Sequence, residues 1–215
     1  MSAVLTVCEI FRSIQGEGTR AGLACGFVRL AGCNLRCAWC DTSYAWEGGR
    51  EMAVDDVLAE VAELAVPRVE VTGGEPLIQP AAFELLRRLC DAGFETLLET
   101  NGSQDISAVD PRVVRVVDLK CPSSGHADAN RWANVPHLTA RDEVKFVLAD
   151  RADYDFARAA VAEHALAARC AVVFQPVHGR LAPATLAEWI LADRLDVRLG
   201  IQLHKLLWPG RERGV

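Results

Sequence analysis

The segment GCNLRCAWCDTSY, residues 32–44, decides the fold, because it places three cysteines within eight residues. Cys33, Cys37 and Cys40 follow the spacing C-x3-C-x2-C. A structural zinc site has four ligands, and a cubane iron–sulfur cluster usually has four cysteine ligands as well. Three thiolates on one short loop leave one iron of such a cluster open to a substrate or cofactor. The spacing favours this cluster, and a zinc site completed by a ligand from elsewhere in the chain is the alternative.

Outward from this loop, short apolar segments alternate with amphipathic ones, which predicts strands alternating with helices. Such alternation is typical of parallel β/α units, and the helices are too few for a closed eight-fold barrel. We therefore expect an α/β fold, a partial, open (β/α) barrel of mostly parallel strands, with residues 1–215 forming a single domain. The expected strands are 4–11, 25–32, 68–73, 94–101, 112–120, 143–149, 171–176 and 198–203, and the expected helices are 54–65, 80–93, 152–168 and 183–195.

Composition narrows the class of protein. The chain of 215 residues is 51% hydrophobic and 24% charged, which is ordinary for a globular protein. A net charge of −6 gives no reason to expect a nucleic-acid partner. No apolar run approaches the roughly 18 residues that span a bilayer, and the first residues do not resemble a secretory signal. We expect a cytoplasmic protein that has no membrane partner and keeps its eight cysteines reduced.

Polar motifs follow most of the expected strands. In a β/α fold the carboxyl ends of the strands share one rim, where active sites lie. Each motif alone is more typical of a turn, but together they predict a site at this rim. Besides the cysteine loop, the motifs are TGGEP (72–76), ETNG (99–102), DLKCPSSG (118–125), QPVH (175–178) and QLHK (202–205).

The cysteine spacing, with Trp39 before the last cysteine, resembles the signature of the radical S-adenosylmethionine (SAM) superfamily. The resemblance implies a [4Fe-4S] cluster with three cysteine ligands, whose open iron binds SAM. It also implies reductive cleavage of SAM to methionine and a 5′-deoxyadenosyl radical. The matching motifs, and the position of residues on the rim, indicate which residues contact SAM. They are Gly73, Gly74, Glu75, Glu99, Asn101, Asp118, Leu119, Lys120, Gln175, Pro176, Val177 and His178.

Further motifs resemble one family within this superfamily, the 7-carboxy-7-deazaguanine synthases, nearly end to end. They are FRSIQGEG (11–18), Arg29, CDTSY (40–44), TGGEP, DLKCPSSG and QLHKLLWPG (202–210). The resemblance implies an Mg²⁺-dependent ring contraction of 6-carboxy-5,6,7,8-tetrahydropterin to 7-carboxy-7-deazaguanine, with loss of ammonia, in queuosine and other 7-deazapurine biosynthesis. It also implies a homodimer and an electron donor such as flavodoxin or ferredoxin.

Several residue types suit a pterin substrate. Gln15 and Glu17 offer amide and carboxylate partners to an amino-pyrimidinone edge, although a flexible glycine turn is the simpler interpretation. Arg29 has the planar fork that clamps a carboxylate, or it forms an ordinary surface ion pair. The resemblance implies that the Thr42 hydroxyl binds Mg²⁺, where the residues alone indicate a turn cap. It also implies substrate contacts from Ile14, Gly16, Thr72 and Pro209, with His204 a further candidate.

Two other functions stay open at this point. A glycyl-radical-enzyme activase is also a short radical SAM protein, but it would leave segments 15–17 and 204–209 without a pterin to bind. A non-catalytic zinc-binding module would explain the cysteines alone and would need none of the other motifs.

Overall fold

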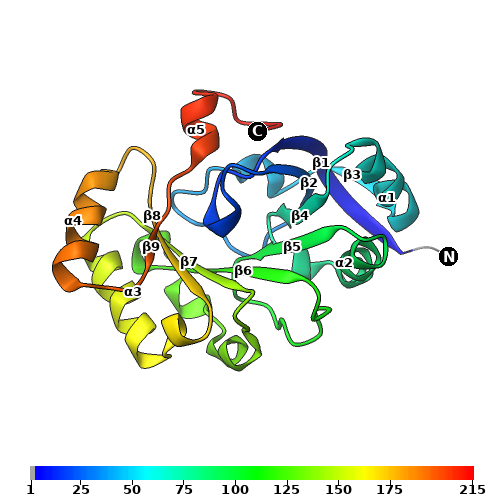
Figure 1. Cartoon of the computed structure of the whole chain (residues 1–215). Coiled ribbons are helices and arrows are strands. Elements are labelled where there is room, and N and C mark those ends of the chain that lie inside the picture. The colour runs from blue at the N-terminus through cyan, green and yellow to red at the C-terminus, as the bar shows by residue number, and fades with distance from the viewer. Residues whose placement is uncertain (1–2) are drawn as a thin grey trace.

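The computed structural model describes residues 3–215, which form a nine-stranded sheet in the order β3-β1-β2-β4-β5-β6-β7-β8-β9 (Figure 1). Neighbouring strands are parallel from β2 to β9, whereas β1 is antiparallel to both β2 and β3. Strands β3 and β9 are the two edges, so the sheet is open and the expected partial barrel is confirmed. The strands are β1 (Val4–Ile14), β2 (Ala24–Leu30), β3 (Arg50–Ala53), β4 (Arg68–Gly73), β5 (Glu95–Thr100), β6 (Val114–Leu119), β7 (Glu143–Leu148), β8 (Ala171–Pro176) and β9 (Arg198–Leu199).

Helices follow many of the strands and bury their apolar side chains in one core with them. The α-helices are α1 (Val54–Glu63), α2 (Ala81–Asp91), α3 (Arg151–Glu163), α4 (Pro183–Asp193) and α5 (Leu203–Leu207). Figure 1 shows α5 and the C-terminus beside the N-terminal half, where the Leu203 amide donates to the Gly16 carbonyl at 3.0 Å. Within residues 3–215, no helix combines the length and the apolar character needed to cross a membrane.

The two faces of the central strands differ, and this difference positions the site. In β7, Val144, Phe146 and Leu148 belong to the core shared with the helices. Lys145 and Val147 alternate with them and line a large cavity on the other side of the sheet. Because successive side chains of a strand point to opposite faces, one strand serves both the core and the cavity.

The expected elements differ from the structure at three main places. Strand β3 (50–53) is absent from the expected strands, because two of its four residues are exposed and charged and the apolar alternation typical of a strand is missing. The predicted strand 198–203 was wrong beyond Leu199, since Gly200 packs against β8 and residues 203–207 form α5. The predicted helix 152–168 ends at Glu163, before Ala165 adopts a left-handed conformation.

Candidate active site

A cavity of about 790 Å³ lies on the inner face of the sheet and at the carboxyl ends of its strands. It brings together most of the residues that the sequence singles out, from Ile14 at the end of β1 to Pro209 beyond α5. The predicted site residues that line it are Ile14, Gln15, Gly16, Glu17, Arg29, Cys33, Cys37, Cys40, Thr42, Thr72, Gly73, Gly74, Glu99, Asn101, Asp118, Lys120, Gln175, Val177, His178, His204 and Pro209.

The cysteine loop is fixed against the segment that follows β6. The Trp39 indole N–H donates to Ser123 Oγ at 3.0 Å, and the Ala38 amide donates to the Ser124 carbonyl at 3.1 Å. The Arg36 amide donates to Nε2 of His126 at 3.0 Å. The loop is therefore held in place by residues about 85 positions away along the chain, and Trp39 has a specific structural role here.

The three loop cysteines are free thiols on the wall of the cavity. Cys33 Sγ accepts from the Leu35 amide at 3.4 Å and from Asn101 Nδ2 at 3.9 Å. Burial raises the pKa of Cys37 and of Cys40, and the charge of Lys120 opposes this rise at both thiols. Hydrogen bonds to sulfur and a nearby cation are the surroundings that stabilise thiolates bound to iron. This donor set fits an iron–sulfur cluster.

Within residues 3–215, no group of three or more His, Cys, Asp or Glu side chains is arranged to hold a single metal ion. A cubane cluster binds each thiolate at a different iron, so it suits cysteines that are farther apart than the ligands of one zinc.

The glycines of TGGEP have a packing role that the sequence did not predict. A Cβ at Gly73, whose φ is +148°, would overlap the carbonyl oxygen of Leu30, and a Cβ at Gly74 would overlap that of Gly32. The Gly74 amide instead donates to the Leu30 carbonyl at 3.1 Å. The glycine pair lets the end of β4 lie directly against the start of the cysteine loop.

Three predicted SAM residues do not line the cavity. Glu75 is fully buried, and its carboxylate accepts from Thr100 Oγ1 at 2.8 Å and from the Asn101 amide at 2.6 Å. It thereby ties the end of β4 to the end of β5. Leu119 belongs to the hydrophobic core, because it points to the opposite face from its neighbours Asp118 and Lys120. Pro176 is also buried.

Two buried acceptors on the cavity wall have no hydrogen-bond partner within the part of the chain that is described: Asp118 Oδ1 and Gln175 Oε1. The other oxygen of Asp118 accepts from Lys120 at 2.9 Å. A buried acceptor without a hydrogen bond costs free energy, so such atoms in a native site usually accept a hydrogen bond from a ligand or a water molecule. The pair therefore marks where donor groups of a bound molecule are expected.

Arg29 on β2 faces the cavity but already has one partner. Its Nε donates to Glu9 at 2.8 Å, and the Tyr44 hydroxyl donates to the same carboxylate at 2.9 Å. An irregularity in the β1–β2 register after Val7 places Glu9 opposite Arg29. The ion pair of the alternative interpretation is present, but it does not lie on the surface, because the Arg29 side chain is only 13% exposed.

Thr42 lies where the cysteine loop meets the C-terminal segment. Its hydroxyl donates to Asp41 Oδ1 at 3.1 Å, while Asp41 Oδ2 accepts from Gln202 at 2.9 Å and Lys205 at 2.6 Å. Burial alone raises the pKa of Asp41, but the Lys205 ammonium and these hydrogen bonds bring it well below its usual range. Asp41 is thus ionised near neutral pH and adds negative charge beside the Thr42 hydroxyl.

The sequence missed several residues that this cavity contains. Glu70 and Lys145 are each flanked on both sides by apolar residues of a strand, and a charge in that setting is the signal that points to them. Asp41 also lines the cavity and contacts Thr42, and Glu9 contacts Arg29 from outside the cavity; no motif indicated either contact.

Comparison with known proteins agrees with the fold and the site. The sequence model described as the Radical SAM superfamily matches residues 28–118, the span that holds the cysteine loop and the TGGEP and ETNG motifs. The crystal structure of QueE from Escherichia coli aligns with a TM-score of 0.77 at 24% identity, over 93% of this chain and 94% of that one. The class of protein that the fold and the site define is that of the radical SAM enzymes, which use a [4Fe-4S] cluster and SAM.

Two curated relatives narrow the class further. One from Koribacter versatilis is 44% identical over 98% of this chain and 100% of its own length, and it is named 7-carboxy-7-deazaguanine synthase. Another with the same name, from Chlorobaculum tepidum, is 48% identical over 99% of this chain and 98% of its own length. The chain belongs to the 7-carboxy-7-deazaguanine synthase family. Neither the activase nor the zinc module is favoured by these similarities.

Proposed function

We propose that this protein converts 6-carboxy-5,6,7,8-tetrahydropterin to 7-carboxy-7-deazaguanine, with loss of ammonia, in the biosynthesis of queuosine or another 7-deazapurine. The observation that carries the proposal is the cavity itself. It joins the cysteine loop to three distant segments, at 14–17, at Arg29 and at 204–209, in a chain related over its full length to synthases of this name. The glycyl-radical activase and the zinc module leave these segments without a ligand.

Cys33, Cys37 and Cys40 are the proposed cluster ligands. Gly73, Gly74, Glu99 and Asn101 on β4 and β5 are the proposed wall for the methionine part of SAM, and Asp118 and Gln175 are acceptors for its donor groups. When bound, the cluster and SAM supply the one-electron chemistry that removes a hydrogen atom from the substrate. The proposed contacts on the adenosine side of SAM are Lys120, Val177 and His178. The proposed role of Glu75, Leu119 and Pro176 is to support the cavity wall from behind.

The substrate is proposed to lie between the cysteine loop and α5. Arg29 is proposed to bind the substrate carboxylate, because burial between the sheet and the Tyr44 ring strengthens a charge-assisted bond. Gln15 and Glu17 face the amino-pyrimidinone edge. The other contacts are assigned to Ile14, Gly16, Thr72, His204 and Pro209. Holding the ring and its carboxylate in one orientation is the main catalytic contribution of these residues.

Mg²⁺ is proposed to bind at the Thr42 hydroxyl, with substrate oxygens and water as its other ligands. The ionised Asp41 beside that hydroxyl supports a divalent cation at this position.

Replacement of Thr42 by alanine tests the Mg²⁺ site. We expect product formation by Thr42→Ala to be the same with Mg²⁺ as after chelation, whereas the unchanged protein responds to Mg²⁺. Iron content should stay at the wild-type level, because Thr42 is not a thiolate ligand. Ser43→Ala, at the next position, should keep the response. Loss of iron from Thr42→Ala would show that the assignment is wrong.

The turnover experiment tests the function as a whole. Reconstituted protein is incubated anaerobically with the carboxy-tetrahydropterin, SAM, Mg²⁺ and a reductant, and 7-carboxy-7-deazaguanine is followed by mass. An unchanged pterin spectrum, together with a glycyl radical on an added partner protein, would favour the activase instead. One zinc per chain after anaerobic purification, with no iron or sulfide, would favour the zinc module.

The proposal also covers the domain organisation, the oligomeric state, the electron donor and the cellular compartment of the enzyme. We infer that residues 1–215 act as one domain, that two chains form a homodimer, and that flavodoxin or ferredoxin supplies the electron. An oxygen-sensitive cluster and free cysteines suit the reducing cytoplasm.

A further inference from the structure

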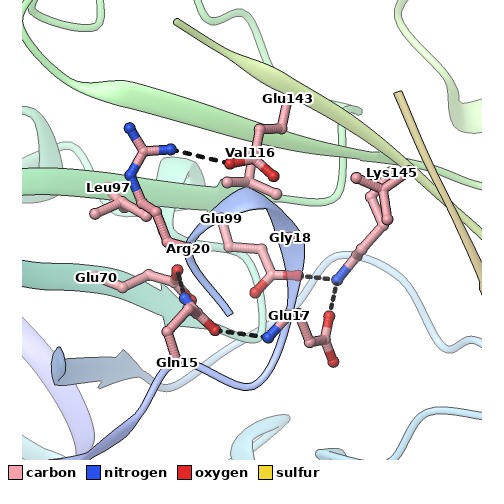
Figure 2. Close-up of a pocket in the computed structure, with 11 residues that line it drawn as sticks. Gln15, Glu17, Gly18, Arg20, Glu70, Leu97, Glu99, Val116, Glu143 and Lys145 are labelled. Atoms are coloured by element: carbon pink, nitrogen blue, oxygen red, sulfur yellow. Dashed lines mark hydrogen bonds and ion pairs between the residues drawn. The ribbon is translucent and has the colours of Figure 1, made fainter. Parts of the chain in front are cut away.

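Five residues, joined in a row by the hydrogen bonds drawn in Figure 2, form what we call the ring behind the proposed substrate position. Gln15 Nε2 donates to Glu70, and Gln15 Oε1 accepts from the Glu17 amide at 3.2 Å. The Glu17 carboxylate accepts from Lys145 at 2.7 Å, and Lys145 also pairs with Glu99. The two ends of this row, Glu70 and Glu99, are carboxyl groups that line the same two cavities and interact with each other.

The ring is the wall between two cavities. All five of its residues line the large cavity, and all five also line a small cavity of about 10 Å³ behind it. The small cavity holds about one water molecule, so the substrate can meet the ring only from the large one. The far side of the small cavity is closed by Arg20 and Glu143, which Figure 2 shows paired with each other.

The ring holds more carboxyl groups than cations. Glu17, Glu70 and Glu99 are three carboxyl groups around one ammonium, and the exposed fraction of Glu70 is only 3%. Two hydrogen-bonded carboxyl groups cannot both ionise at little cost. Lys145 pairs with Glu17 and Glu99, so those two hold the negative charges, whereas Glu70 forms no ion pair with any residue of 3–215. Burial, and next the charge of Glu99, raise the pKa of Glu70 well above its usual range.

We propose that Glu70 and Lys145 are positioning residues for the pterin, with Glu70 acting as a neutral carboxylic acid. One Glu70 oxygen accepts from Gln15, and the protonated oxygen donates to Glu99. The ring thereby fixes the orientation of the Gln15 amide and the Glu17 carboxylate toward the large cavity. Since those groups are the proposed partners of the amino-pyrimidinone edge, this inference rests on the proposed function. The five-residue ring thereby lets the site distinguish the amino-pyrimidinone edge from heterocycles that carry other hydrogen-bond donors and acceptors.

If Glu70 is a neutral acid, its glutamine and alanine variants should differ in their affinity for the pterin. Glutamine reproduces both hydrogen bonds of a protonated Glu70, because its oxygen can accept from Gln15 and its nitrogen can donate to Glu99. Alanine removes both and leaves Gln15 Nε2 without its acceptor. We therefore expect Glu70→Gln to keep kcat/KM for the pterin within about threefold, and Glu70→Ala to raise KM about tenfold or more.

Asp142→Asn is the matched control for stability. Asp142 is a buried carboxylate that pairs with Arg115 at 2.7 Å and does not line the large cavity. Its loss should lower the unfolding temperature and leave KM for the pterin unchanged. If Glu70→Ala behaved in the same way, Glu70 would be merely structural. If Glu70→Gln were as impaired as Glu70→Ala, the neutral acid would be ruled out.

Infrared difference spectra give a readout that does not depend on turnover. The spectrum of the unchanged protein minus that of Glu70→Gln should show the carbonyl band of a protonated carboxyl group at neutral pH. Absence of that band would overturn the proposal. If the unchanged protein made no 7-carboxy-7-deazaguanine, the proposed function would fail separately, and the infrared band would still decide the protonation of Glu70.

Discussion

Replacing Cys37 by alanine is expected to abolish both the cluster and product formation. Cys37 lines the cavity with Cys33 and Cys40, and three thiolates are the fewest that hold a cubane cluster with one open iron. Two remaining ligands would not retain it. Iron and sulfide in Cys37→Ala should fall to background after anaerobic reconstitution, and product should fall by at least about 100-fold, as is usual when a metal site is impaired.

Cys90 provides the control for this prediction. It is a half-buried free thiol on α2 and lies outside the cavity. Cys90→Ala should keep full iron content, sulfide content and turnover. A Cys37→Ala protein that retained four irons and activity would contradict the assignment of the three loop cysteines as the ligands.

Replacing Gly73 by alanine is expected to be the most destabilising change outside the cysteines. A Cβ at this position would overlap the Leu30 carbonyl, and the φ of +148° is one that only glycine adopts without strain. Backbone atoms cannot move aside as a flexible side chain can. Overpacking and strain together should lower the free energy of unfolding by about 3 to 5 kcal/mol, measured by denaturant titration of the cluster-free protein.

Gly93 separates the two causes. It also has a positive φ, +87°, but a Cβ there meets no atom within 4 Å. Gly93→Ala should therefore cost only about 1 kcal/mol, the strain of a left-handed residue. Gly73→Ala should in addition reconstitute less cluster than Gly93→Ala, because Gly73 packs against the start of the cysteine loop. Equal losses of stability in the two variants would refute the packing role.

Local patterns predicted most of the fold. Alternating strands and helices between residues 54 and 195 were confirmed, because each element carries its own periodicity in a short window. The wrong predictions of secondary structure fall in segments whose local sequence carries no such periodicity. The edge strand β3 is stabilised by pairing with β1, and α5 begins after a Gly200 that packs on β8. Both depend on contacts with distant parts of the chain.

The residues of the site divide in the same way. The spacing of Cys33, Cys37 and Cys40 indicated the class of chemistry, because the ligands of a cluster lie on one loop. The roles proposed for the cofactor and substrate residues stay predictions, although most of these residues line one cavity. A motif does not specify which face of a strand or turn a side chain occupies, so the sequence could not show that the side chains of Glu75 and Leu119 lie outside the cavity.

The sequence by itself thus determined the reaction class of this protein, since ligand spacing and strand periodicity are local properties. Only the tertiary structure decided which charged residues share the cavity with the cysteine loop. Lys145 meets Glu17 across 128 positions and Glu99 across 46, and Glu70 joins them from a third strand. Parallel strands bring distant residues to one face, and the cost of burying their charges is met only where the partners converge.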